Sequence, residues 1–310
     1  MKVDPCFAEL LAEPRNTVRP PPAHVPMSKV RRAADGAMAQ GQMPQMAAVS
    51  DAHVRVNDRE IPIRHYRPTG AIDLPVIVFC HGGGFVWGSI DTHDGLCRRL
   101  AAQTGAAVVS VGYRLAPETP FPGPVDDVFG VLRHLVQAAE ILGIDPQRIA
   151  LCGDSAGGQI AASVTVMAGR AGINLRHLAL IYPALDPTCN SDSQLALAEG
   201  PLLTRAAMQW FWSCYLGPTP PEPGHLHDVL NAELGSFPPT TIATAECDLL
   251  RNEGEAFAAK LSTNGTDVLL HPCDGMIHGF MSLPIASGVA DRCLATITAR
   301  IRKDLAERLG

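Results

Sequence analysis

The chain has 310 residues, of which 46% are hydrophobic and 18% charged, and its formal net charge is −6. These values are typical of a globular protein with a sizeable buried core, and they exclude a disordered chain. A negative net charge without a basic run argues against a nucleic-acid partner. No apolar stretch reaches the ~20 residues that a membrane span needs, so we expect none.

The N-terminal residues lack the long apolar stretch of a secretory signal, so we do not expect one. The nine cysteines are scattered, odd in number and without a Cys-x-x-Cys pair. Several of them, such as Cys80 and Cys152, lie within apolar runs. This pattern favours small buried side chains in a reducing compartment over a disulfide framework or a zinc site. The expected location is therefore the cytoplasm.

Residues 1–50 are rich in Pro, Ala and Met, and we expect a short amphipathic helix within 1–11. Alternating polarity over 52–57 and 60–67 predicts a β-hairpin. From residue 75 onward, short continuous apolar runs alternate with helical segments, which indicates a parallel sheet with helices on both faces. The expected strands are 76–80, 107–111, 149–152, 178–182, 240–245 and 268–271. The expected helices are 93–103, 125–142, 156–168, 253–262 and 290–309.

The stretch 186–237 interrupts this alternation and is long enough to fold over a site between strands. It holds a proline-rich segment and an aromatic run, Trp210-Phe211-Trp212. The aromatic run either packs a surface helix onto the body or lines an apolar pocket as part of a lid. The candidate pocket residues are Trp87, Met208, Trp210 and Phe211.

Residues 153–158 read Gly-Asp-Ser-Ala-Gly-Gly and fit the pattern Gly-x-Ser-x-Gly with Ser155 at its centre. An apolar run precedes the motif and a helical run of small residues follows it. Strand, sharp turn and helix are the context in which such a serine is exposed as a nucleophile, beside a helix N-terminus that favours negative charge. The alternative is an ordinary glycine-rich turn in which Ser155 caps the helix.

Three consecutive glycines follow His81, directly after the apolar run 76–80. Such a glycine run is costly unless the backbone must approach a ligand closely or point its N–H groups at one. We expect Gly83 and Gly84 to donate to an oxyanion, with the N–H of Ala156 as a third donor. His81 is predicted to orient the loop rather than to carry protons. The alternative is a flexible turn without a ligand.

A serine nucleophile needs a base, and the base needs a carboxylate that holds its tautomer. His278 lies in a glycine-bearing loop, 274–280, after the last apolar run, and is the candidate base. The other histidines downstream of Ser155 lie in strand-like runs or in the insertion: His177, His225, His227 and His271.

For the acid, Asp248 follows the apolar run 240–245, at the strand end where sites of open α/β sheets lie. Asp274 is the rival, but it is only four residues before His278. Asp154 adjoins the serine and is expected to point elsewhere. We favour Asp248 as the acid of the triad. The alternative role for Asp248 is that of an N-cap for the helix that follows it.

Assembled in this way, the chain resembles the hormone-sensitive-lipase-like (bacterial family IV) esterases of the α/β-hydrolase superfamily, over roughly residues 60 to 300. Two positions depart from the family pattern, because Leu249 stands where proline is common and Asn252 where aspartate is common. The blocks that carry the resemblance are 81–85 with Gly88 and 91–94, 113–118 with 121–122 and 126–127, 153–158, 248–253 and 275–280, together with the opening 3–5.

The resemblance implies an α/β-hydrolase fold with a mostly parallel central sheet, helices on both faces and a helical cap. Residues 1–50 and the insertion 186–237 would form the cap, and 51–185 with 238–310 the catalytic domain. The resemblance also implies small ester substrates with short acyl chains.

The function predicted is that of a serine carboxylesterase in which Ser155, His278 and Asp248 form the triad, with no metal or organic cofactor. An amidase or N-deacetylase with the same triad is the close alternative. A non-catalytic ligand-binding protein is disfavoured because all three triad residues are present. A lipase that acts at lipid interfaces is disfavoured because the proline-rich stretch 217–224 does not have the pattern of an apolar lid. A homodimer through the final helix and an edge strand stays open.

Overall fold

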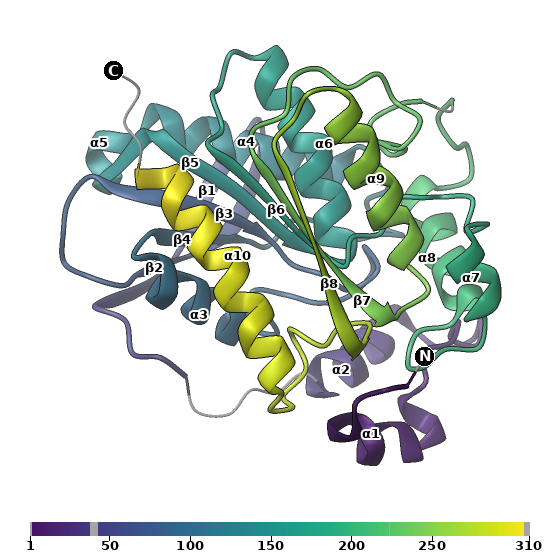
Figure 1. Cartoon of the computed structure of the whole chain (residues 1–310). Coiled ribbons are helices and arrows are strands. Elements are labelled where there is room, and N and C mark those ends of the chain that lie inside the picture. The colour runs from purple at the N-terminus through teal and green to yellow at the C-terminus, as the bar shows by residue number, and fades with distance from the viewer. Residues whose placement is uncertain (1, 38–42, 223, 307–310) are drawn as a thin grey trace.

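The computed structural model of the chain describes residues 2–37, 43–222 and 224–306 (Figure 1). Its centre is an eight-stranded sheet in the order β1-β2-β4-β3-β5-β6-β7-β8. The first two strands form an antiparallel hairpin, β2 pairs antiparallel with β4, and all later pairs are parallel. The strands are β1 (Ala48–Val56), β2 (Arg59–Arg67), β3 (Leu74–Cys80), β4 (Ala107–Val111), β5 (Ile144–Asp154), β6 (His177–Ile181), β7 (Thr240–Cys247) and β8 (Val268–Ile277).

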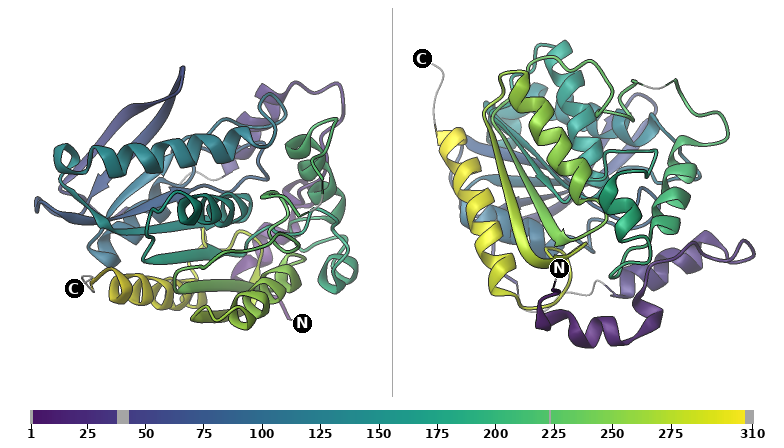
Figure 2. Two further views of the ribbon diagram at one scale, coloured as in Figure 1. Left: turned by 90° about the horizontal axis from the view of Figure 1, so that it is seen from above. Right: turned by 45° about the vertical axis from the view of Figure 1, so that its right-hand side comes forward.

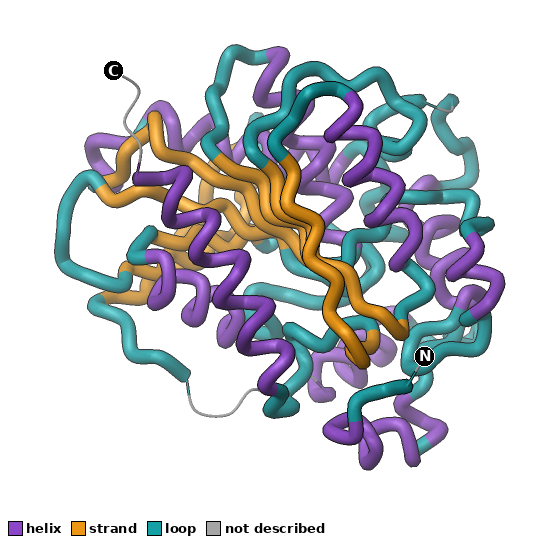
Figure 3. Tube along the Cα trace, viewed as in Figure 1, coloured by secondary structure: helices purple, strands orange, loops and turns teal. Residues whose placement is uncertain are grey.

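Helices cover both faces of this twisted sheet (Figure 3). Alternate residues of β3 point to opposite faces, so Val76 and Val78 pack with α4, α6 and α9, whereas Ile77 and Phe79 pack with α3 and α10. The helices are α1 (Ala8–Ala12), α2 (Met27–Ala37), α3 (Asp94–Thr104), α4 (Gly123–Gln137), α5 (Ala139–Leu142), α6 (Ala156–Arg170), α7 (Asp192–Ala196), α8 (Arg205–Leu216), α9 (Arg251–Thr263) and α10 (Gly288–Ala306), with the 3₁₀ turns η1 (Pro5–Phe7) and η2 (Pro14–Asn16).

Every strand predicted from the sequence is present, and the differences are mostly at the ends. The helix expected over 125–142 is divided at Ala138 into α4 and α5, and the one expected within 1–11 is η1 followed by α1. The helix expected over 290–309 is α10, and residues 307–309 of that prediction lie outside the described residues.

The loop expected over 274–280 is wrong in its first part, because β8 continues to Ile277. The pairing of β7 with β8 is irregular after Ala245 and Cys273, where two residues of β7 stand against four of β8, and it resumes with Cys247 opposite Ile277. The N–H of Gly275 donates to the Glu246 side chain at 2.8 Å, which secures the strand at this point. As a result, His278 follows the end of a strand directly.

The N-terminal segment and the insertion lie at the same end of the molecule, beyond the carboxyl ends of the parallel strands (Figure 2). Val18 forms a β-bridge with Leu203, and the Thr204 hydroxyl donates to the Val18 carbonyl oxygen at 2.8 Å. Within the described residues, no helix is long and apolar enough to cross a membrane.

Candidate active site

Ser155 stands on a strained turn between β5 and α6. Its backbone has φ 51° and ψ −121°, a conformation that a residue with a side chain adopts only when its surroundings impose it. The flanking residues must be glycines because the backbone of neighbouring segments comes very close to them. A Cβ on Gly157 would lie 2.0 Å from the carbonyl oxygen of Cys80, and a Cβ on Gly153 would lie 2.2 Å from the carbonyl oxygen of Gly157. Strand and helix therefore pack tightly on either side of the turn that holds Ser155, as the motif predicts, and the residue is 6% exposed.

The structure brings Ser155, His278 and Asp248 together from three strand ends. The Ser155 Oγ lies 2.9 Å from His278 Nε2, and His278 Nδ1 lies 2.7 Å from Asp248 Oδ2. The other Asp248 oxygen accepts the N–H of Leu250 at 3.0 Å. Because a carboxylate only accepts, Nδ1 carries the proton and Nε2 faces the serine hydroxyl as an acceptor.

The other candidates from the sequence lie apart from this group. His177 pairs with Asp304 at 2.8 Å, and His227 packs edge-on against Phe121. Asp274 is exposed. His225 stacks near His227, and His271 belongs to a separate cluster on β8.

The glycine loop after β3 has the conformation of a donor loop. Gly83 and Gly84 have φ of 119° and 59°, in the region that only glycine adopts readily. The Gly83 carbonyl accepts the N–H groups of Val86 and Trp87, which closes the loop. Within the described part of the chain, the N–H groups of Gly83, Gly84 and Ala156 have no acceptor. They are thus available to a substrate oxygen.

His81 lies beneath this loop and is fully buried. Its Nδ1 is 2.8 Å from the Gly82 carbonyl oxygen and its ring stacks on Tyr113, with centroids 4.2 Å apart. Burial, together with the nearby His93, lowers the pKa of His81 to about 3. The ring is neutral at ordinary pH, which agrees with an orienting role and not with proton transfer.

Asp154 connects the turn that holds Ser155 to the glycine loop, a contact not predicted from the sequence. Its Oδ1 accepts the N–H of Gly82 at 2.8 Å, and its Oδ2 lies 3.3 Å from His93 Nε2 and 3.2 Å from Ser282 Oγ. Burial alone would raise the pKa of Asp154, but His93 and these hydrogen bonds bring it below its ordinary value. The carboxylate therefore stays charged inside the protein. The feature of the sequence that could have indicated this contact is the position of an acidic residue directly before the serine of the motif.

Aromatic side chains cover the glycine loop. A Cβ on Gly84 would lie 2.4 Å from the Phe211 ring, so this ring rests on the loop itself. Trp87 makes an edge contact with Phe211 at 4.5 Å and lies 6.1 Å from Trp210. Met208 is buried on the same helix.

Trp212 faces the other way and stays in the core, where its ring lies 5.0 Å from that of Phe85. Phe211 and Trp212 are both buried, so the run packs its helix onto the body, and a role of these side chains in lining a pocket stays a prediction.

The two departures from the family pattern do not disturb the acid. The Leu249 side chain is buried and its carbonyl oxygen accepts the Ser193 hydroxyl at 2.7 Å. Asn252 Oδ1 accepts the Ser193 N–H at 2.8 Å. An aspartate would make the same acceptor contact, so the amide preserves the bond that ties this loop to the insertion.

Comparison with known proteins agrees with the fold and the motifs. A family model described as an α/β-hydrolase fold matches residues 77–282. The ethyl acetate hydrolase of Pseudomonas putida is 34% identical over 280 residues, which cover 87% of this chain and 87% of that protein. Carboxylesterase NlhH of Mycobacterium tuberculosis is 38% identical over 254 residues, 77% of this chain and 78% of that protein.

Among solved structures, the esterase of the hyperthermophilic archaeon Pyrobaculum calidifontis superimposes with a TM-score of 0.88 at 34% identity, covering 98% of this chain and 99% of that one. The chain belongs to this α/β-hydrolase family, among the hormone-sensitive-lipase-like esterases. The fold class and the family predicted from the sequence are both confirmed.

Proposed function

We propose that the protein is a serine carboxylesterase that uses Ser155 as nucleophile, His278 as general base and acid, and Asp248 as the carboxylate that orients His278. The observation that carries this proposal is the continuous chain of contacts, 2.9 Å from Ser155 Oγ to His278 Nε2 and 2.7 Å from His278 Nδ1 to Asp248. The named relatives, an ethyl acetate hydrolase and carboxylesterases, support the same class of reaction.

In the acylation step, Ser155 attacks the ester carbonyl while His278 Nε2 takes the hydroxyl proton. Negative charge develops on the carbonyl oxygen, and the N–H groups of Gly83, Gly84 and Ala156 stabilise it. These donors are preorganised, since the loop is closed by its own hydrogen bonds, and such a donor contributes about 10²–10³-fold to the rate. His278 then returns the proton to the leaving alcohol.

In the second step, water attacks the acyl-enzyme with His278 again as base, and the acid is released. Asp248 stabilises the imidazolium that forms in each step. The chemistry of these residues needs no metal or organic cofactor.

The cap assigned to residues 1–50 and 186–237 is part of this proposal. Arg31 of α2 donates to the Val86 carbonyl oxygen at 2.7 Å and to that of Ala116 at 3.0 Å, and it pairs with Glu118. The cap helix is thereby held to the glycine loop. Because Phe211 also rests on this loop, we expect the enzyme to favour small esters with short acyl chains.

The cytoplasmic location and the homodimer remain predictions. The free cysteines motivate the location, which fractionation of the producing cells would test. Equilibrium sedimentation of the purified chain would test the dimer.

The test of the proposed activity is the hydrolysis of 4-nitrophenyl esters from acetate to palmitate by the native chain and by Ser155→Ala. We expect turnover of the short esters and a loss of at least about 10⁴-fold in the variant. Ser163→Ala, which changes a buried serine two turns further along α6, is the control and should keep most of the rate. The corresponding 4-nitroanilides measure the amidase alternative. Equal rates in native and Ser155→Ala protein would refute the proposal.

A further inference from the structure

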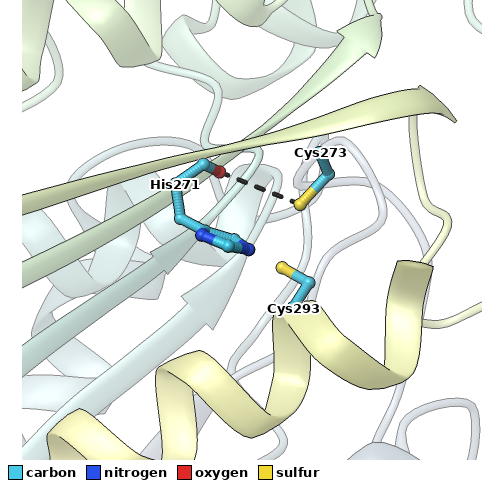
Figure 4. Close-up of side chains that lie close together, drawn as sticks. All are labelled: His271, Cys273 and Cys293. Carbon is cyan, nitrogen blue, oxygen red and sulfur yellow. Dashed lines mark hydrogen bonds between the residues drawn. The ribbon is translucent and has the colours of Figure 1, made fainter. Parts of the chain in front are cut away.

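A second group of reactive side chains lies between β8 and α10, apart from the serine site. His271 and Cys273 come from β8 and Cys293 comes from α10, and the three side chains point toward one another (Figure 4). One ligand atom of each, an imidazole nitrogen and two sulfurs, lies within 4.8 Å of the other two. The group belongs to none of the contacts assigned to ester hydrolysis.

The fold explains why these side chains meet. His271 and Cys273 are two residues apart on a strand, so they point to the same face of the sheet. That face is covered by α10, whose Cys293 is fully buried. Cys273 is 1% exposed, whereas His271 is partly accessible, so solvent reaches the group from the imidazole side.

The contacts inside the group are weak. Cys273 Sγ donates to the His271 carbonyl oxygen at 3.8 Å, which is the hydrogen bond drawn within the group in Figure 4. A thiol is a poor hydrogen-bond donor, so little is lost when a stronger interaction replaces this bond.

We propose that His271, Cys273 and Cys293 bind one Zn²⁺ ion, with a water molecule as the fourth ligand. Tetrahedral zinc with bonds of about 2.0–2.3 Å places its ligand atoms roughly 3.4–3.8 Å apart. The separations of at most 4.8 Å therefore need to shorten by about 1.4 Å at most. Imidazole and thiolate are the ligands that this ion prefers.

The charges balance in this arrangement. Each thiol releases its proton to solvent on binding, and the two thiolates with Zn²⁺ form a neutral group that can be buried without an unpaired charge. No electron is transferred and no bond other than the S–H and metal–ligand bonds changes. The ion would join β8 to α10 a few residues before His278, and it would stabilise the folded chain because the unfolded chain does not hold the three ligands together.

The experiment uses the full-length, untagged protein, reduced and freed of metal. Zn²⁺ is titrated against a chelating indicator, and Co²⁺ is added in parallel for its absorption spectrum. We expect one equivalent of Zn²⁺, a melting temperature that rises with Zn²⁺ concentration, and the thiolate-to-Co²⁺ charge-transfer band. His271→Ala should weaken Zn²⁺ binding at least about 10-fold, and Cys293→Ala should abolish both the binding and the band.

Cys214→Ala, which removes a partly exposed thiol of α8, is the control and should bind Zn²⁺ as the native chain does. Retained ester hydrolysis shows that each variant is folded, and His271→Ala tests the site without opening a cavity in the core. Zn²⁺ uptake that is unchanged in both His271→Ala and Cys293→Ala would overturn the proposal. So would a Co²⁺ complex without the charge-transfer band, or a Cys273–Cys293 disulfide whose reduction restores no Zn²⁺ uptake.

Discussion

Asp154 Oδ1 accepts a hydrogen bond from the N–H of Gly82 at 2.8 Å, which ties the residue before the nucleophile to the first glycine of the glycine loop. A Cβ on Gly82 would lie 2.7 Å from the other carboxylate oxygen, so the two groups are in close contact. The turn that holds Ser155 and the loop that holds the proposed oxyanion donors are therefore one unit.

Removing this contact should impair the transition state more than substrate binding. We expect Asp154→Ala to lower kcat by about 10²-fold, with a smaller change in KM, because the donors of the loop lose their fixed position. Asp154→Asn should be milder, since its amide oxygen can still accept from Gly82. The measurement is steady-state hydrolysis of a short 4-nitrophenyl ester.

Binding of a trifluoromethyl ketone, which forms an oxyanion with the serine, separates this effect from a general loss of structure. Its affinity should fall in parallel with kcat in the Asp154 variants. Asp126→Asn, an exposed carboxylate of α4, serves as the control. Unchanged inhibitor affinity in Asp154→Ala would show that the loop does not depend on this contact.

The two acids considered for the triad can be distinguished by one pair of variants. Asp248→Asn keeps the shape of the side chain but no longer fixes the proton on His278 Nδ1, and we expect kcat to fall by about 10⁴-fold. Asp274→Asn changes an exposed carboxylate four residues before His278 and should keep the native rate. The reverse order of effects would assign the acid to Asp274.

Much of this site could be predicted from the sequence because its reactive residues lie in short motifs. Ser155, the glycines after His81, and Asp248 each follow an apolar run, and strands of a parallel sheet deliver their carboxyl ends to one edge. His278 was also found, although its strand was predicted to end too early. Asp274 and Gly275 interrupt the apolar pattern after Cys273, and only the pairing of Cys247 with Ile277 shows that the strand continues.

Contacts between distant segments could not be predicted, because no local pattern encodes them. The position of Phe211 over Gly84 depends on how the insertion folds back across β3. Cys273 and Cys293 are twenty residues apart and follow no metal-binding spacing, so only the packing of α10 on β8 brings them together. The sequence therefore indicated inert buried cysteines where the structure presents a cluster of potential ligands.

The Phe211 ring should limit the length of the acyl chain. Phe211→Leu removes part of the ring that rests on the glycine loop, so we expect the rate for hexanoate relative to acetate to rise by about 10-fold. Phe237→Leu is the control, since that ring packs against Phe257. The ratio is measured with 4-nitrophenyl esters under kcat/KM conditions. A ratio that stays the same in Phe211→Leu would mean that another side chain sets the chain length.

His65 should make the folded chain less stable in mild acid. Burial and the charge of Arg67 lower its pKa from 6.5 to about 4. The pKa of His65 is thus lower in the folded chain than in the unfolded chain, so folding favours the neutral imidazole. The stability of the folded chain is therefore unaffected by His65 protonation above about pH 6.5. As the pH falls from 6.5 toward 4, the unfolded chain binds a proton that the folded chain does not, and stability decreases.

The change appears as a slope of the unfolding free energy against pH. His65→Gln cannot take up this proton, so the slope between about pH 6.5 and 5 should be smaller by up to about 1.4 kcal/mol per pH unit. The pKa of His81 is also lowered, so the unfolding free energy of both the native and the His65→Gln protein retains some pH dependence of the same sign. Urea unfolding at several pH values measures the slopes, with His53→Gln on the exposed side of β1 as the control. Identical slopes for native and His65→Gln protein would show that His65 is protonated equally in the folded and unfolded chains.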